Sequence, residues 1–527
     1  MKVKDVVIVG GGSAGWMTAA ALDVLCPHVN VTLIEDPNQG VIGVGESTLQ
    51  QIRKFIGLLG LKDSDWMKDI GATYKTAISF NDFWKKGESW MYPFGLVNMM
   101  ESKVPWMAWF VLNATKPEKY TNDTFATTFN PVAHFTKYNK LTYDTTYWTP
   151  WTDTAYHIDA IKFGQWLKNN VCKRVKHIKG VVSGWQQKPN GDIESIIYGG
   201  KRLSADLFVD CSGFKSLLLG DAMGVEFESF LYGEGGCLLN DKAISISVPH
   251  EDPSKEVTNT TNCTALNNGW VWDVPLWERG GLGYVYSSKF ITEDQAQVEL
   301  YDYLVRSRGK ERADAVTYKS IPIKTGKHKK SFVGNVIGIG LSNNFLEPLE
   351  STGILVLHEQ VIRLCNALSG RNGFIPKVEK EMINQISDYE IEGQKNFVAA
   401  HYAFSEREEP YWQTASDVID YDFSGGADNY FLRHASHKYI NFDFVSPMGS
   451  IEYNDGPRYC AAGMGFNPIN KVTLPLSRMC NEILPEEDDE ALSKAEDIID
   501  KWHEDMLSYC ETLPSSYEFL KQTIYKE

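Results

Sequence analysis

The chain has 527 residues, of which 52 are Lys or Arg and 68 are Asp or Glu, so its formal net charge is -16 at pH 7. This acidic balance excludes nucleic acid and anionic membranes as favoured partners. A composition with 43% hydrophobic and 23% charged residues excludes a disordered chain. The length exceeds what one simple hydrophobic core supports, so we expect two domains or two interleaved modules.

The cysteines indicate a reducing compartment. There are nine of them, scattered along the chain and without a Cys-x-x-Cys pair, so the sequence predicts neither a disulfide framework nor a zinc or other metal site. Residues 1–5 lead directly into a predicted strand, and no apolar stretch is long enough to cross a bilayer. We therefore expect a cytoplasmic protein that acts on a small molecule, and the sequence leaves a homodimer open.

A strand, a glycine-rich turn, a helix and a second strand are predicted in that order at the N-terminal end. The β-branched run 6–9 is typical of a strand buried in a parallel sheet. The turn Gly10-Gly11-Gly12-Ser13-Ala14-Gly15 follows, residues 16–25 form an Ala- and Leu-rich helix, and the second strand, over 29–34, is closed by Glu35. This order and spacing predict a βαβ unit that binds a dinucleotide.

The residues of this unit have separate physical roles. Gly10 allows the tight turn, Gly12 lets the backbone approach a pyrophosphate, and Gly15 permits close packing of the helix on the strand. The helix N-terminus directs unpaired N–H groups at the phosphates, and Glu35 lies where a carboxylate accepts hydrogen bonds from a ribose. The predicted cofactor-binding residues here are Gly10, Gly12, Ser13, Ala14, Gly15 and Glu35.

Two later runs favour FAD over NAD as the dinucleotide. Residues 206–213 and 335–340 are each predicted to form a buried strand that ends in small residues, although ordinary core strands give the same pattern. As later strands of the same sheet, they would return their carboxyl ends to the cofactor, because open α/β sheets bind ligands at that edge. Gly340 and Leu341 are therefore further candidate cofactor contacts.

Four further motifs follow. Residues 43–48, which we term the strap, form a glycine-rich turn that could pass close to a flat ring. The segment 71–78 presents the single Lys75 among apolar neighbours, and Trp270-Val271-Trp272 and the run 347–353 lie further downstream. Taken alone, each motif has an ordinary interpretation as a turn, a solvated lysine or aromatic residues packed in a core.

In this order the motifs resemble the flavin-dependent halogenases, in particular their tryptophan-halogenase branch. Residues 269–275 are similar to the family's Trp-x-Trp-x-Ile-Pro signature, with Val274 in place of isoleucine, and the resemblance extends from residue 5 to about residue 470. It implies FAD as FADH2, together with O2 and a halide ion (chloride, bromide or iodide). Since the chain has no second nucleotide fingerprint, the resemblance also implies a separate NAD(P)H-dependent flavin reductase that supplies FADH2.

The resemblance implies roles for particular residues. Halide would be oxidised to hypohalous acid, with the N–H groups of Thr352 and Gly353 as the halide nest. Lys75 falls on the lysine that carries the halogen to the substrate, and Glu350 falls on the glutamate that stabilises the cationic intermediate. The tryptophan pair would separate the flavin from the substrate. The remaining implied contacts are Gly45 and Glu46 for the flavin, and Tyr92, Phe94, Trp270, Trp272 and Tyr453 for the substrate.

Two departures bear on the substrate. Where tryptophan halogenases have a histidine and a phenylalanine beside the indole, this chain has Tyr92-Pro93-Phe94. In the segment 436–456, Met448 and Tyr453 replace a glutamate and a tryptophan. We therefore expect an electron-rich arene such as an indole or a phenol, free or carrier-bound, rather than free tryptophan.

The motifs and the predicted elements together give the expected fold. We expect an α/β protein with a Rossmann-like FAD-binding module of the flavin-monooxygenase type, made of residues 1–80 and 157–370. A mainly helical substrate-binding module, made of residues 81–156 and 371–527, is interleaved with it. The stretch 81–156 is dense in aromatic residues, which indicates an irregular core or the wall of an aromatic-ligand pocket.

Two other functions are consistent with the fingerprint. The first is a flavin-dependent aromatic monooxygenase, but such hydroxylases carry an Asp-Gly motif near the second flavin strand, and the only Asp-Gly here is Asp455-Gly456. The second is a flavin-binding protein without turnover. The presence of both Lys75 and Glu350 argues against that second alternative.

Overall fold

A computed structural model describes residues 1–38, 45–95, 100, 103–370, 372–419, 456–465 and 489–526. The chain divides into two compact units, each built from three separate stretches. Unit 1 comprises Met1–Ala72, Tyr156–Asp241 and Ile321–Lys395, and unit 2 comprises Thr73–Ala155, Lys242–Ser320 and Asn396–Glu527. Both units are therefore discontinuous in the sequence.

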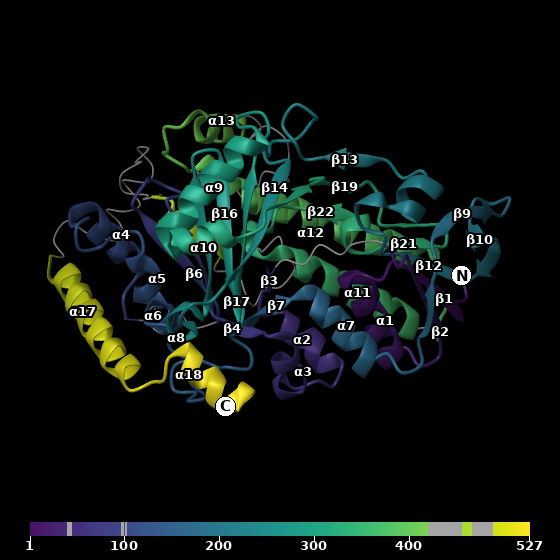
Figure 1. The fold of residues 1–527 in the computed structure, drawn as a ribbon. Coiled ribbons are helices and arrows are strands. Elements are labelled where there is room, and N and C mark those ends of the chain that lie inside the picture. Colours follow the sequence, from purple (N-terminus) through teal and green to yellow (C-terminus); the bar gives the residue numbers. More distant parts are fainter. Residues whose placement is uncertain are drawn as a thin grey trace. The chain divides into compact units, whose positions relative to one another are not determined.

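Unit 1 is organised around a six-stranded sheet in which all strands but one edge strand are parallel (Figure 1). The central strand β1 (Asp5–Val9) pairs with β2 on one side and with β12 on the other, and Val7 lies opposite both Thr32 and Phe208. In spatial order the strands are β20 (Phe332–Val333), β21 (Val336–Gly338), β12 (Leu207–Asp210), β1, β2 (Asn30–Glu35) and β8 (Lys176–Lys179).

Helix α1 (Ser13–Leu25) follows β1 after the glycine-rich turn and packs against α7 (Ala160–Asn170) and α11 (Thr352–Ser369) (Figure 1). A Cβ built on Gly164 of α7 would lie 3.4 Å from the Cα of Ser13, so the two helices approach closely at this glycine. The strand–turn–helix–strand order confirms the predicted α/β fold with a Rossmann-like dinucleotide-binding unit.

Smaller elements complete unit 1. An antiparallel sheet of β9, β10 and β11 and a second one of β13, β19 and β22 accompany the main sheet. Helix α12 begins in unit 1 and continues into unit 2 at residue 396. These elements are β3 (Gly45–Ser47), α2 (Ile52–Leu58), α3 (Asp63–Ile70), β7 (Ala155–Asp159), β9 (Val182–Gln187), β10 (Ile193–Tyr198), β11 (Lys201–Ser204), η1 (Gly213–Lys215), η2 (Leu217–Ala222), β13 (Phe227–Ser229), β19 (Gly326–His328), η3 (Gly340–Ser342), β22 (Asn344–Phe345), η4 (Pro348–Glu350) and α12 (Lys377–Ala403).

Unit 2 contains a seven-stranded sheet in the order β18-β14-β17-β16-β15-β5-β6. Helix α9 packs on this sheet through Leu300 and Leu304, which belong to one hydrophobic cluster with Leu282 and Tyr284 of β17. The strands and sheet-covering helices are β4 (Thr73–Lys75), β5 (Ala77–Asn81), β6 (Ser89–Pro93), β14 (Lys242–Pro249), β15 (Thr260–Leu266), β16 (Gly269–Pro275), β17 (Arg279–Tyr286), α9 (Glu293–Arg308), α10 (Lys310–Ala315) and β18 (Lys319–Pro322).

The remaining helices of unit 2 come mostly from its first and last stretches. Helix α17 packs against α4, α5 and α6, which brings the C-terminal part of the chain against the residues that follow the sheet's edge strand β6. These helices are α4 (Trp106–Thr115), α5 (Thr124–Phe129), α6 (Pro131–Lys137), α8 (Pro253–Glu256), α13 (Pro410–Ile419), α15 (Gly456–Gly463), α17 (Asp489–Glu511), α18 (Ser516–Leu520) and η6 (Lys521–Tyr525).

The boundaries between the units differ from the expected ones. Residues 242–320, expected in the FAD-binding module, fold with unit 2, which therefore holds a large sheet in addition to its helices. The physical reason is a parallel pairing of β15 with β5, in which Thr260 lies opposite Ala77 and Thr264 opposite Asn81. This pairing places β14 to β17 in the same sheet as β5 and β6.

Candidate active site

The glycine-rich turn after β1, which we term the cradle, has the shape that a bound phosphate group requires. A Cβ on Gly10 would lie 2.1 Å from the carbonyl oxygen of Cys211, and one on Gly15 would lie 2.0 Å from the carbonyl oxygen of Gly10, so only glycine fits at either position. A Cβ on Gly12 would meet nothing within 4 Å, which leaves open space beside the start of α1. Gly12 caps α1 without a side-chain hydrogen bond, and the first turn has no acidic residue. The first N–H groups of α1 are thus available to an anion, and the turn fits a dinucleotide pyrophosphate.

The other predicted cofactor residues of the βαβ unit surround this turn. Glu35 is the last residue of β2. A Cβ built on Gly11 would lie only 1.8 Å from the Oε2 of Glu35, so this carboxylate rests against the turn. Ala14 lies against the turn at Gly340: a Cβ built on Gly340 would lie 3.0 Å from the Cβ of Ala14. The hydroxyl of Ser13 donates to the carbonyl oxygen of Ala160, so only the backbone of Ser13 faces the cradle.

Gln360 is a residue at this cradle that sequence reasoning did not find. The Gly340 N–H donates to its Oε1 over 2.9 Å, and Leu341, next to Gly340, is 42% exposed. The Nε2 of Gln360 is buried and meets no acceptor within the described part of the chain. An orphaned buried donor beside the cradle is a further feature that fits a bound polar cofactor. A single amide on a helix carries no motif, so no sequence signal indicated it.

The predicted halide site lies at the start of α11. Glu350 ends the short helix η4 and is 1% exposed, and Ser351 follows in the left-handed conformation with φ 58. Ser351 caps α11 without a side-chain hydrogen bond to its N–H groups, and the first turn contains no acidic residue. The N–H groups of Thr352 and Gly353 therefore begin a long helix, and among the described residues nothing lies within 4 Å of a Cβ built on Gly353, an arrangement that suits an anion.

The strap contacts this turn. Its residues 43 and 44 lie outside the described part, and residues 45–47 form β3, which pairs with β7. The Ser351 hydroxyl donates to the Ser47 hydroxyl over 3.0 Å. Burial and, next, the charge of Asp159 raise the pKa of Glu46 to about 7, so this carboxyl holds a proton more readily than an ordinary glutamate does.

Within unit 2, the structure brings Lys75, Phe94 and Tyr92 together. Lys75 is 0% exposed, and its Nζ lies 4.9 Å from the centroid of the Phe94 ring. The Tyr92 ring meets Phe94 edge to face, at 5.7 Å, and stacks on Tyr459 with a centroid distance of 6.0 Å. Tyr459, on α15, was not predicted, whereas the predicted Tyr453 lies outside the described residues, as does Met448.

The predicted tryptophan pair lies on β16 of unit 2. Trp270 and Trp272 are 0% and 8% exposed, and their ring centroids are 6.3 Å apart. They share one face of the strand, as alternate residues do. Opposite Trp272 on β17, a Cβ on Gly283 would lie 2.1 Å from the indole, so this glycine makes room for the ring.

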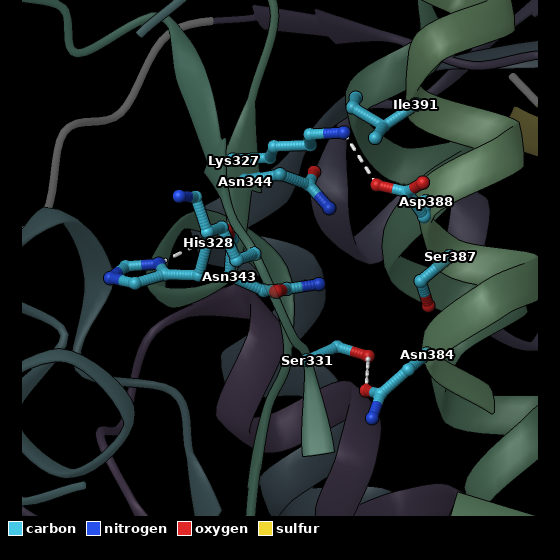
Figure 2. A pocket seen from close by; sticks show the side chains of 10 residues that line it. Lys327, His328, Ser331, Asn343, Asn344, Asn384, Ser387, Asp388 and Ile391 are labelled. Atoms are coloured by element: carbon cyan, nitrogen blue, oxygen red, sulfur yellow. Dashed lines mark hydrogen bonds and ion pairs between the residues drawn. The ribbon is translucent and has the colours of Figure 1, made fainter. Parts of the chain in front are cut away.

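A separate cleft lies in unit 1 between the β19–β22 region and α12 (Figure 2). Lys327, which is 7% exposed, projects across it and pairs with Asp388 at 2.5 Å and with Glu392 at 2.6 Å. The Ser331 hydroxyl donates to the Asn384 Oδ1 over 3.1 Å. None of the predicted site residues lines this cleft, and Lys327, the lysine that projects across it, is already ion-paired. We interpret the cleft as the junction that fastens α12 to the neighbouring strands.

The parallel sheet and the glycine-rich turn between β1 and α1 define an α/β protein of the dinucleotide-binding class. Comparison with known proteins makes this class specific: the family model described as Tryptophan halogenase matches residues 5–421. The chain therefore belongs to the tryptophan halogenase family.

Individual relatives support the same assignment over the whole length. The chain is 29% identical to Tryptophan 7-halogenase RebH of Lentzea aerocolonigenes, covering 99% of each protein. Among solved structures, it is similar to the VirX1 apo structure, with 38% identity, a TM-score of 0.90 and full coverage of both chains. It is also similar to the crystal structure of Tryptophan 6-halogenase SttH from Streptomyces toxytricini, with 28% identity, a TM-score of 0.82 and coverage of 98% and 99%.

Family membership settles the general activity. The protein is a flavin-dependent halogenase, an oxidoreductase that uses FADH2, O2 and a halide ion to halogenate an aromatic substrate. This confirms the predicted cofactor and enzyme class and favours halogenation over the monooxygenase alternative. Within the described residues, none of the helices combines the length and the apolar character that a membrane crossing requires.

Proposed function

We propose that this enzyme halogenates an electron-rich indole- or phenol-like arene other than free tryptophan, with Lys75 as the residue that delivers the halogen. The observation that carries this proposal is the burial of Lys75 at 0% exposure against the Phe94 ring. Lysine side chains are rarely buried completely, because burial takes the ammonium group out of water. A role in the reaction therefore explains the burial of this lysine better than a contribution to the stability of the fold does.

The cofactor residues of unit 1 would hold FADH2 through its pyrophosphate and ribose. When bound, FADH2 and O2 supply the oxidation of halide to hypohalous acid. Gly10, Gly12 and Gly15 allow the backbone to reach the pyrophosphate, and α1 directs its free N–H groups and positive dipole end at the phosphates. Glu35 accepts hydrogen bonds from the ribose, and Gly45, Glu46, Gly340 and Leu341 are the proposed contacts with the rest of the cofactor.

The start of α11 would hold the halide. The N–H groups of Thr352 and Gly353 offer hydrogen bonds to an anion, and the helix dipole adds to the attraction. We assign Glu350, which directly precedes this turn, to charge stabilisation: its carboxylate balances the cation that forms on the ring and helps the departing proton to leave.

The aromatic residues define the proposed substrate class. Lys75, Phe94 and Tyr92 are neighbours in unit 2, so an aromatic ring bound there would contact hydrocarbon faces beside an ammonium group. Trp270, Trp272 and Tyr453 are the remaining proposed pocket residues. Tryptophan halogenases have a histidine where this chain has Tyr92, and a glutamate where it has Met448. The glutamate could pair with the amino group of tryptophan and methionine cannot, so these two replacements support an arene without an amino-acid moiety.

The proposed partners follow from the chemistry. FADH2 must be regenerated elsewhere, and we infer a separate NAD(P)H-dependent flavin reductase as its source. The acidic charge and the scattered cysteines support a cytoplasmic setting. A homodimer remains a proposal.

A reconstituted assay tests this function. The protein is incubated with FAD, a flavin reductase, NADH and a panel of indoles, phenols and free tryptophan, with chloride, bromide or iodide in turn, and products are identified by mass spectrometry. We expect halogenated indoles or phenols. In Lys75→Ala, halogenated product should disappear while FADH2 reoxidation continues, and Lys103→Ala, which removes an exposed lysine of the same unit, should act as wild type. Product formation by Lys75→Ala near the wild-type rate, or oxygenated products without halogen, would overturn the proposal.

A further inference from the structure

The Glu35 carboxylate is contacted by two side chains, a lysine and a histidine, from different elements of unit 1. Its Oε1 accepts a hydrogen bond of 3.3 Å from the Nζ of Lys168 on α7. The Nε2 of His177 on β8 lies 2.7 Å from the same oxygen, at the distance of an ion pair but without the alignment of a hydrogen bond. All three side chains are largely buried, with exposures of 17% for Glu35 and 23% for each partner.

The other carboxylate oxygen faces the glycine-rich turn. A Cβ on Gly11 would lie 1.8 Å from Oε2, so this oxygen rests directly against the backbone of the turn. Because Lys168 and His177 both approach Oε1, they leave Oε2 directed at the side of the turn where a dinucleotide lies.

Trp16 contacts both the Lys168 and the His177 side chains. It is 1% exposed and is the fourth residue of α1, the helix that follows the glycine-rich turn. The Lys168 Nζ lies 4.8 Å from the centroid of its indole, and the His177 ring meets it edge to face at 5.2 Å. The cluster therefore connects α1, α7, β2 and β8 at one point behind the cofactor cradle.

We propose that Lys168 and His177 are positioning residues for the adenosine end of FAD. This inference rests on the proposed assignment of Glu35 to the ribose. Lys168 and His177 hold the Glu35 side chain in the one orientation that presents Oε2 to a ribose hydroxyl. The Lys168 ammonium group also offsets the negative charge of a carboxylate that must lie near a doubly negative pyrophosphate, and so lowers the repulsion that FAD meets on binding.

A merely structural role would look different in solution. If the cluster only tied β2, β8 and α7 together, its loss would weaken every flavin alike, in proportion to the loss of fold stability. If it positions Glu35, its loss must weaken ligands that carry adenosine and spare those that lack it. FAD and ADP carry adenosine, and FMN lacks it, so the ratio of their affinities separates the two roles.

The experiment measures dissociation constants of FAD and FMN by flavin fluorescence, and of ADP by competition with FAD. The test variants are Lys168→Met, which keeps the alkyl chain, and His177→Phe, which keeps a ring against Trp16. The matched controls are Lys162→Ala and Lys176→Ala, which remove exposed cations from the same helix and the same strand. Lys168→Arg preserves the cation. Melting temperatures are recorded for every variant.

We expect Lys168→Met to raise the FAD and ADP dissociation constants about tenfold, in the range of one lost charge-assisted contact. His177→Phe should act in the same direction, and the FMN constant, both controls and Lys168→Arg should stay within about twofold of wild type. The inference is overturned if FAD affinity is unchanged in both test variants, or if FMN weakens by the same factor as FAD. Glu35→Gln distinguishes failure of the ribose assignment from failure of this inference. Normal FAD affinity in Glu35→Gln would contradict the assignment of Glu35 to the ribose. A loss of FAD affinity in Glu35→Gln alone would contradict only the positioning role of Lys168 and His177.

Discussion

The hydroxyl of Ser351 donates a hydrogen bond of 3.0 Å to the hydroxyl of Ser47, which joins β3 of the strap to the turn from which α11 begins. Ser351 is 2% exposed and has φ 58, a left-handed conformation that costs a residue other than glycine roughly 1–2 kcal/mol. The N–H groups of Thr352 and Gly353 follow this strained residue directly. The contact with Ser47 therefore helps to hold the proposed halide nest in shape.

Ser47→Ala should weaken halide use without loss of the cofactor. The loss of about 1 kcal/mol from one hydrogen bond corresponds to roughly a fivefold higher KM for halide. The KM for bromide and the dissociation constant of FAD are the two measurements, and Ser183→Ala, which removes a hydroxyl from an exposed position on β9, serves as the control. If the KM for halide is unchanged, the hydrogen bond does not support the nest.

Glu350→Gln should keep the fold and lower the halogenation rate. The substitution preserves the size of a side chain that is 1% exposed and removes the charge that we assign to stabilising the arenium cation. The rate should fall by roughly 10²-fold if the carboxylate also takes the proton. Single-turnover product formation and flavin reoxidation are measured together, and only the first should slow. An equal rate in the exposed control Glu381→Gln and in Glu350→Gln would remove Glu350 from the chemistry.

Local patterns predicted the glycine-rich turn of the cofactor cradle, and the family resemblance implied the proposed catalytic residues, whereas long-range contacts escaped prediction. Gly10 and Glu35 belong to one continuous strand–turn–helix–strand unit, so their spacing alone carries the information. The pairing of Thr260 with Ala77 joins strands far apart in the chain. Alternating hydrophobicity shows that both segments are strands but does not show which strand is the partner. This is why residues 242–320 were expected in the other unit.

The same reasoning explains the missed site residues. Gln360, Tyr459, Lys168 and His177 are single side chains on helices or strands, without a motif of their own. They gain a role only from what the fold places beside them: the N–H of Gly340, the ring of Tyr92, and the carboxylate of Glu35. Sequence patterns report periodicity and spacing, and neither contains this information.

Acid should destabilise unit 1 through His358. The ring is buried in α11, stacks on Phe55 at 5.9 Å, and neither ring nitrogen meets a hydrogen-bond partner within the described part of the chain. Burial first, and then the charges of Lys54 and Arg363, lower the pKa of His358 to about 3 from its ordinary value of 6.5. The stabilising effect of keeping the ring neutral is therefore complete above pH 6.5. It is lost as the pH falls toward 3, because the unfolded chain binds a proton that the folded one does not.

Measured denaturation curves between pH 7 and pH 4 test this sign. The free energy of unfolding should fall by roughly 1.4 kcal/mol per pH unit for each such histidine. In unit 2, burial lowers the pKa of His134 to about 3 and that of His503 to about 4, so these two act in the same direction there. His358→Phe should remove one histidine's share of the pH dependence in unit 1. A slope identical to wild type would contradict the assignment.

Lys327→Met should loosen the attachment of α12 to β19. Burial lowers the pKa of Lys327, but the carboxylates of Asp388 and Glu392 outweigh that effect and raise it above its ordinary value. Without the cation, Asp388 and Glu392 are left as neighbouring like charges four residues apart on α12, on the helix side of the cleft shown in Figure 2. Since Asp388 is half exposed, water relieves part of the repulsion, and we expect a loss of about 1–2 kcal/mol at pH 7. Thermal melting should show a smaller loss in Lys327→Arg.

Free tryptophan should be a poor substrate relative to simple indoles and phenols. Met448 offers no charged acceptor to an ammonium group, and Tyr92 lies beside Phe94 where the relatives' pattern has an imidazole. The missing charge-assisted contact is worth about 1.5–3 kcal/mol, or roughly ten- to a hundredfold in affinity. Competition assays that compare kcat/KM for tryptophan, indole and a phenol measure this directly.

On the small arenes, the halogen should enter at the most nucleophilic carbon, because a ring without an anchored side chain is free to present that carbon to Lys75. Tight binding of tryptophan with halogenation at a single, electronically disfavoured position would show that the chain anchors the amino-acid moiety by other residues.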